Sequence, residues 1–277
     1  MRDTRAMPTP KHPLDAATHL EPLAADLYRG HTSANYANMV GPFGGAIAAT
    51  LLNATLQHPG RQGDPIALTV NYAGPLADGG FTVEANPVRT NRSTQHWLLV
   101  MKQGEQIAAT ASAVLASRRE TWSALEARFP DVPAAHELPV EPNLERAPWT
   151  CSYEMRFVAG AVRLSPPARQ AGDSRSTLWI RDAPPRPLDF VSLVAICDAF
   201  FPRLFVRRPG WVPIGTVSFT TYFHADAALL AANGEAPVLG TARAQQFRNG
   251  YFDQTAEVWS EQAALLATSH QIVYYKE

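Results

Sequence analysis

This sequence of 277 residues is poor in cysteine and carries almost no excess charge. Its two cysteines, Cys151 and Cys197, fit no metal-ligand spacing, and Cys197 lies in an apolar stretch. We therefore expect both to be reduced, packed thiols. The formal net charge of -1 lacks the basic excess that binding to nucleic acid or to an anionic membrane surface requires. The composition gives no support to a nucleic-acid partner.

Long apolar runs are also missing. No stretch reaches the length of apolar residues needed to span a bilayer, and residues 1–20 lack the apolar core of a signal peptide. We expect a cytoplasmic protein with no membrane contact, in which residues 1 to about 15 form a loose lead-in.

The motifs of several common enzyme classes are absent from the sequence. There is no GxSxG, no GxxxxGK[ST], no GxGxxG after a strand and no HExxH. Serine-hydrolase, nucleotide-binding and zinc-protease chemistries therefore have no motif behind them. We expect neither a metal ion nor a cofactor.

The most informative stretch that is present covers residues 187–205, PLDFVSLVAICDAFFPRLF. Its apolar residues lie on nearly every face of a predicted helix, which is typical of a helix enclosed by other structure. One acid, Asp198, lies near the middle of this stretch. Because a carboxylate there is poorly solvated, Asp198 is a functional candidate. The alternative is a structural ion pair or a helix edge that faces solvent.

A second helix of small and apolar residues is predicted over residues 44–56, GGAIAATLLNATL. Gly44 and Gly45 lie where the first turn leaves backbone N–H groups unpaired, so a ligand could approach those donors closely. Close packing of the helix start against a sheet explains the glycines equally well. From residue 66 four strand-like runs follow, separated by turn-forming clusters.

The order of these elements repeats in the second half of the chain. Residues 119–148 combine a short helical stretch with a proline-rich run, as expected of a linker. Strands, the apolar helix with Asp198 and a further strand series follow, and IAATASAVL at 107–115 aligns with LLATSHQIV at 265–273. We expect an N-terminal unit over 1–118 and a C-terminal unit over 149–277, each a sheet wrapped on a central helix.

Residues 35–118 and 150–275 resemble the acyl-CoA thioesterase II family, through segments such as GPFGGAIAATLLNAT, STLWIR, IGTVSFTTYFH and LLATSHQIV. The resemblance implies an α+β double hot-dog fold, an acyl-CoA substrate and a homo-oligomer. The family places its catalytic aspartate in the second central helix, a threonine at the start of the next strand and a glutamine in the last strand. The matching residues here are Asp198, Thr216 and Gln271.

The comparison of the two halves predicts one active site per chain. Gln271 aligns with Ala113, and the first central helix has no acid, only Thr50 and Asn53 as polar candidates. Strand alternation is expected to place His224 on the same face as Thr216, where it could touch the substrate. An ordinary histidine at a strand end is the alternative. The family often has Arg-Pro after this histidine, and Ala-Asp stands here instead, which puts a contact to the CoA phosphates from this strand in doubt.

We therefore expect hydrolysis of an acyl-CoA to a free acid and CoA by a water molecule that Asp198, Thr216 and Gln271 position and activate. The start of the first helix, at Gly44 and Gly45, is the candidate donor to the thioester oxygen. A non-catalytic acyl-binding protein of the same fold is one alternative. A hot-dog hydratase or dehydratase is another, but no histidine occurs in AFFPRLFVRR after Asp198.

Overall fold

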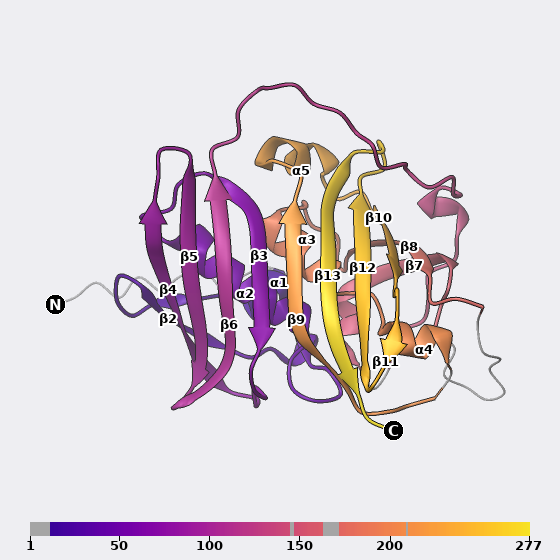
Figure 1. Ribbon diagram of the computed structural model, residues 1–277, viewed down its shortest axis with the longest axis horizontal. Coiled ribbons are helices and arrows are strands. Elements are labelled where there is room, and N and C mark those ends of the chain that lie inside the picture. Colours follow the sequence, from indigo (N-terminus) through magenta and orange to yellow (C-terminus); the bar gives the residue numbers. More distant parts are fainter. Residues whose placement is uncertain (1–11, 145–146, 163–171, 209) are drawn as a thin grey trace.

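The computed structural model describes residues 12–144, 147–162, 172–208 and 210–277. Within them the strands form one sheet in the order β1-β2-β4-β5-β6-β3-β9-β13-β12-β10-β8-β7, and β11 pairs with β12 (Figure 1). The strands are β1 Glu21–Pro22, β2 Leu27–His31, β3 Asp64–Tyr72, β4 Gly80–Thr90, β5 Thr94–Gln103, β6 Gln106–Ala116, β7 Tyr153–Ala159, β8 Ser176–Asp182, β9 Ile214–Phe223, β10 Val238–Arg243, β11 Phe247–Arg248, β12 Tyr251–Trp259 and β13 Leu265–Tyr275. The α-helices are α1 Pro13–Ala17, α2 Gly44–Gln57, α3 Phe190–Cys197, α4 Arg203–Arg207 and α5 Ala227–Asn233.

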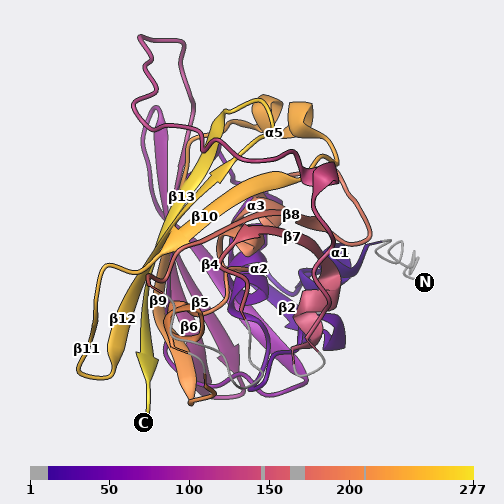
Figure 2. The same ribbon diagram turned by 90° about the vertical axis from the view of Figure 1, so that its right-hand side faces the viewer.

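Two similar halves join at the centre of this sheet. Strand β3 of the first half pairs antiparallel with β9 of the second, with Val70 opposite Phe219. Each half places a helix, α2 or α3, on the same face of its strands, as Figure 2 shows from the side. The predicted double hot-dog fold is therefore confirmed.

The two central helices pack against each other as well as against the sheet. Helix α2 buries Ala48, Ala49, Leu51 and Leu52 completely, and its small residues let a neighbouring helix approach closely. Every residue of α3 is buried. Asp189 is the N-cap of α3, and its side chain accepts a hydrogen bond from the Ser192 backbone N–H.

One element differs from the prediction in a way that matters for the site. The stretch over residues 187–205 is not a single helix, because α3 ends at Cys197 and α4 begins only after Pro202. A proline lacks the backbone N–H that would continue a helix, and it disfavours helical backbone in the residue before it. Asp198 is thus the C-cap of α3 and does not lie in the middle of a helix.

The segment between the halves crosses above the sheet in Figure 1. The short helix expected in this region does not form in the described residues, where only two 3-10 turns occur, η2 Ala135–Glu137 and η3 Pro148–Ser152. Phe129 anchors the segment, since its ring contacts Trp179 and Trp259 at centroid distances of 6.4 and 5.8 Å. Buried aromatic contacts hold this connection in place without regular secondary structure.

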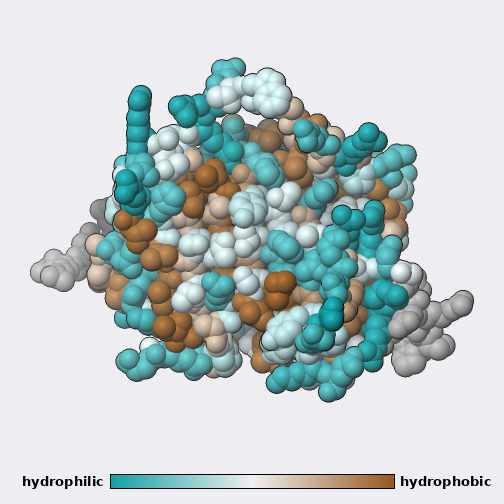
Figure 3. Space-filling view, in the orientation of Figure 1, coloured by the Kyte–Doolittle hydropathy of each residue, from teal (hydrophilic) through white to brown (hydrophobic). Residues whose placement is uncertain are grey.

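The outer face of the sheet is turned to the viewer in Figure 3 and carries polar and apolar side chains together. Along β5 burial alternates, so that Trp97, Leu99 and Met101 lie inside while Leu98 is exposed. Only the inner face of the sheet therefore packs on the central helices. No helix among the described residues is long and apolar enough to cross a bilayer.

Candidate active site

The site lies where the C-terminal end of α3 meets the N-terminal end of α2. A Cβ added to Gly45 would lie 2.7 Å from the Ala195 carbonyl oxygen, and one added to Gly44 would lie 2.7 Å from Asp198 Oδ2. Both distances are far below normal van der Waals contact. The two glycines thus allow the α2 backbone to approach α3 and the Asp198 carboxylate.

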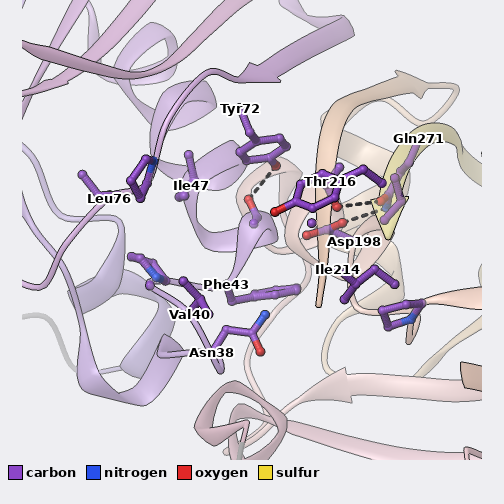
Figure 4. Close-up of a pocket in the computed structure, with 18 of the residues that line it drawn as sticks. Asn38, Val40, Phe43, Ile47, Tyr72, Leu76, Asp198, Ile214, Thr216 and Gln271 are labelled. Carbon is purple, nitrogen blue, oxygen red and sulfur yellow. Dashed lines mark hydrogen bonds between the residues drawn. The ribbon is translucent and has the colours of Figure 1, made fainter. Parts of the chain in front are cut away.

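Hydrogen bonds connect the three residues that the sequence singled out (Figure 4). Gln271 Nε2 donates to Asp198 Oδ1 at 2.7 Å, and the Gly45 backbone N–H also hydrogen-bonds to this carboxylate. Thr216 Oγ1 makes a longer bond, 3.4 Å, to Gln271 Oε1. Asp198, Thr216 and Gln271 therefore lie together, with Gln271 between the other two.

A β-bulge in β9 turns Thr216 toward the site. Ser218 pairs with Ile272, but Thr216 pairs with the next residue, Val273, so Val217 has no partner in the ladder. One extra residue reverses the alternation of faces in a strand. Thr216 consequently lies on the inner face together with Phe219.

His224 does not share that face, and the expectation that it does is wrong for the same reason. The alternation breaks at the bulge, and Tyr222, two residues earlier, is 53% exposed on the outer face. His224 is exposed and hydrogen-bonds to Thr268 Oγ1 at 3.1 Å. It does not line the cavity beside Asp198.

Burial raises the pKa of Asp198 to about 7, even though the hydrogen bonds from Gln271 and Gly45 act in the opposite direction. The carboxylate also lies against the first turn of α2, where the helix dipole favours negative charge. A group with this pKa is present near neutral pH in both its carboxylate and its carboxylic acid form. It can accept a proton from water and release it again.

Tyr72 belongs to the same site, although no sequence pattern singled it out. Tyr72 lies at the end of β3, and its hydroxyl donates to the Gly44 carbonyl oxygen at 2.8 Å. Burial, and next the nearby Asp198, raise the pKa of Tyr72 well above its ordinary value. The tyrosine therefore stays protonated and fixes the first turn of α2. Its only sequence signal was its place within a predicted strand-like run.

A cavity of about 620 Å³ opens beside these residues (Figure 4). Asp198, Thr216, Gln271 and Gly44 contribute to its wall. The apolar part of the wall includes Phe43, Ile47, Leu76, Trp149, Phe200 and Ile214. Among the described residues, no three His, Cys, Asp or Glu side chains are grouped so as to hold a metal ion. The arrangement suits a largely apolar ligand with its polar group at Asp198.

The first half of the chain has no equivalent set of residues. Thr50 Oγ1 donates to the Ala46 carbonyl oxygen, and Asn53 Nδ2 donates to the Thr18 carbonyl oxygen at 2.9 Å. Both of these side chains are thus bonded to backbone carbonyls within the fold. Ala113, which aligns with Gln271, is buried and has no polar side chain.

Comparison with known proteins places both halves in one family. The model of the acyl-CoA thioesterase N-terminal domain matches residues 33–116, and that of the C-terminal domain matches residues 126–275. No curated protein matched the chain.

Solved structures share the fold of this chain. A hot-dog protein of unknown function from Alicyclobacillus acidocaldarius is 47% identical, with a TM-score of 0.91 over 96% of this chain and 98% of that one. The tesB protein of Mycobacterium avium subspecies paratuberculosis is 16% identical, with a TM-score of 0.76 over 95% of this chain and 98% of that one. An acyl-CoA thioesterase II of Mycobacterium marinum is 15% identical, with a TM-score of 0.73 over 95% and 98%. The last two likenesses show the shared fold. Because the two family models together span most of its length, this chain belongs to the acyl-CoA thioesterase family.

Proposed function

We propose that this protein hydrolyses an acyl-CoA thioester to a free acid and CoA, with Asp198 as the base that activates water. The observation that carries the proposal is a carboxylate with a pKa of about 7 that faces a cavity and is held by Gln271 and by the start of α2. Membership of the acyl-CoA thioesterase family supports the substrate class.

The reaction would proceed by direct attack of water. Asp198 accepts a proton as the water oxygen bonds to the thioester carbonyl carbon, and a tetrahedral intermediate forms. The carbon–sulfur bond then breaks, and the proton held by Asp198 passes to the leaving CoA sulfur. Gln271 keeps the carboxylate in position, and Thr216 Oγ1 provides a further hydrogen-bonding group for the water.

The start of α2 is the proposed site for the negative charge that develops on the carbonyl oxygen. The helix has 14 residues, and its N-terminal end carries partial positive charge. Because the Gly45 N–H already bonds to Asp198, we assign the contact with the substrate oxygen to Gly44, which lines the cavity.

A hydratase or dehydratase is less well supported. Hot-dog enzymes of that kind work with a histidine near the acid, and no histidine lines the described cavity. A protein that binds acyl-CoA without turnover is the remaining alternative.

Release of CoA thiol from acyl-CoAs of several chain lengths tests the proposal. We expect Asp198→Asn to lower kcat by about 100-fold or more, with KM changed by only a few fold, because it removes the base and keeps the shape. Asp182→Asn is the matched control, since Asp182 is also a buried acid but does not line the cavity. Equal inactivity of wild type and Asp198→Asn across the panel, with an acyl-CoA still bound, would refute the proposal in favour of a binding protein.

A further inference from the structure

A buried arginine lies behind one wall of the cavity. Arg203 is 1% exposed, and its guanidinium donates to the Phe201 carbonyl oxygen at 3.0 Å, the Ser174 carbonyl oxygen at 3.1 Å and Ser176 Oγ at 2.9 Å. All of these acceptors are neutral. Within the described ranges no carboxylate forms an ion pair with it. Burial lowers the pKa of Arg203 to about 9, so the group stays charged at neutral pH.

This arginine fixes the orientation of Gln254. Arg203 Nε donates to Gln254 Oε1 at 3.0 Å. A guanidinium has only donors, so the amide must present its oxygen to it and turn its NH2 group away. Gln254 is 2% exposed and lines the cavity. It also lies directly opposite Gln271 on the neighbouring strand, on the same face of the sheet.

The NH2 group of Gln254 is thus a donor without an acceptor of its own. Its Nε2 makes no hydrogen bond to any other residue that the structure describes. The cavity wall includes the apolar Phe200 and Val273, and the opposite Gln271 already bonds Asp198 and Thr216. A plain alkyl chain in this part of the cavity would enclose the donor and leave it unpaired, which is unfavourable. An oxygen atom on the ligand would pair with it.

We propose that Gln254 determines specificity by donating a hydrogen bond to an oxygen on the acyl chain, beyond the thioester carbonyl. The preferred substrates are then acyl-CoAs with a hydroxyl or oxo group close to the thioester, because Gln254 lies one strand away from Gln271. Arg203 is a positioning residue that holds the amide in the donating orientation. The proposal deepens, and rests on, the proposed thioesterase function.

Matched four-carbon substrates test it. The kcat/KM values of butyryl-CoA, 3-hydroxybutyryl-CoA and acetoacetyl-CoA are compared in the wild type and in Gln254→Met, which keeps the length of the side chain and removes the donor. We expect at least a tenfold wild-type preference for an oxygenated substrate and its loss in the variant. Gln246→Met, on the exposed surface, is the control and keeps the wild-type preference.

Gln254→Glu is a second variant that preserves the contact with Arg203. A glutamate accepts from the guanidinium but offers no N–H to the substrate, so the preference is again lost while the fold is retained. A purely structural role for Gln254 would lower the values for all three substrates alike. That result, or a preference unchanged in Gln254→Met, would overturn the proposal.

Binding measurements separate this proposal from the proposed function. Calorimetry on Asp198→Asn gives the Kd of butyryl-CoA and of 3-hydroxybutyryl-CoA without turnover. At least tenfold tighter binding of the hydroxylated ligand, abolished by adding Gln254→Met, supports the role of Gln254 even if the wild type hydrolyses neither compound. Equal affinities for the two ligands contradict it even if hydrolysis is observed.

Discussion

The ionisation of Asp198 leads to a prediction about the pH dependence of the rate. Burial raises the pKa of this carboxylate to about 7, and only the ionised form can accept a proton from water. We therefore expect kcat/KM to rise about tenfold per pH unit below 7 and to become constant above it. Thiol release measured from pH 5 to pH 9, corrected for spontaneous hydrolysis, gives this profile.

The opposite slope would be informative. A rate that falls as the pH rises through 7 would mean that the protonated form of Asp198 is the active one, as a general acid. The Asp182→Asn variant is the control for this profile as well, because burial also raises the pKa of Asp182, to about 6. Its profile is expected to match that of the wild type.

The sequence identified some residues of the site and missed others for a physical reason. Asp198, Thr216 and Gln271 were accessible because each occupies a definite place in an element of a recognisable family pattern. Tyr72 and Gln254 gave no such signal. Tyr72 joins the site through the pairing of β3 with β9, which lie far apart in the chain. Gln254 lies on β12, next to β13 in the chain, but only the cross-strand register places it opposite Gln271.

At the scale of elements, the hydrophobic periodicity predicted the position of α3 correctly, but not the residue at which this helix ends. The apolar residues continue past Cys197 into α4, so the hydrophobic pattern shows no break, and only Pro202 marks it. The bulge at Val217 left no mark in the sequence either. It reverses the face of Thr216, which is why strict alternation grouped that residue with His224.

The close contact of α2 with α3 yields a prediction that separates the roles of two adjacent glycines. In Gly44→Ala the new methyl group meets the movable carboxylate of Asp198, so we expect kcat to fall by about 100-fold with a stability change below about 1 kcal/mol. In Gly45→Ala it meets the Phe43 ring and the fixed Ala195 carbonyl, so we expect a loss of about 1–3 kcal/mol of stability.

Urea denaturation and thiol release on both variants provide the measurements. Gly104→Ala is not a suitable control, because the backbone φ of 59° at this position would strain an alanine. Gly172→Ala is suitable, since nothing lies within 4 Å of the added Cβ. A Gly44→Ala variant with full activity would show that Asp198 need not keep its place against α2.

At the scale of the whole molecule, the repeat in the sequence predicted the duplicated architecture. The alignment of 107–115 with 265–273 places β6 and β13 as equivalent last strands, and the structure agrees. The continuous sheet across β3 and β9 could not be inferred in this way, because an internal repeat does not say how its two copies meet.

The fold is duplicated but the active site is not. This leads to the last prediction, which concerns the number of ligand molecules bound per chain. The position equivalent to Gln271 is Ala113, and Thr50 and Asn53 of α2 are bonded to backbone carbonyls. The first half therefore has no equivalent of Asp198 or of Gln271 to hold a thioester and activate water. We expect one molecule of a hydrolysis-resistant acyl-CoA ether to bind per chain in calorimetry, in wild type and in Asp198→Asn alike. Two molecules per chain would contradict this prediction and would mean that the first half binds acyl groups without equivalents of Asp198 and Gln271.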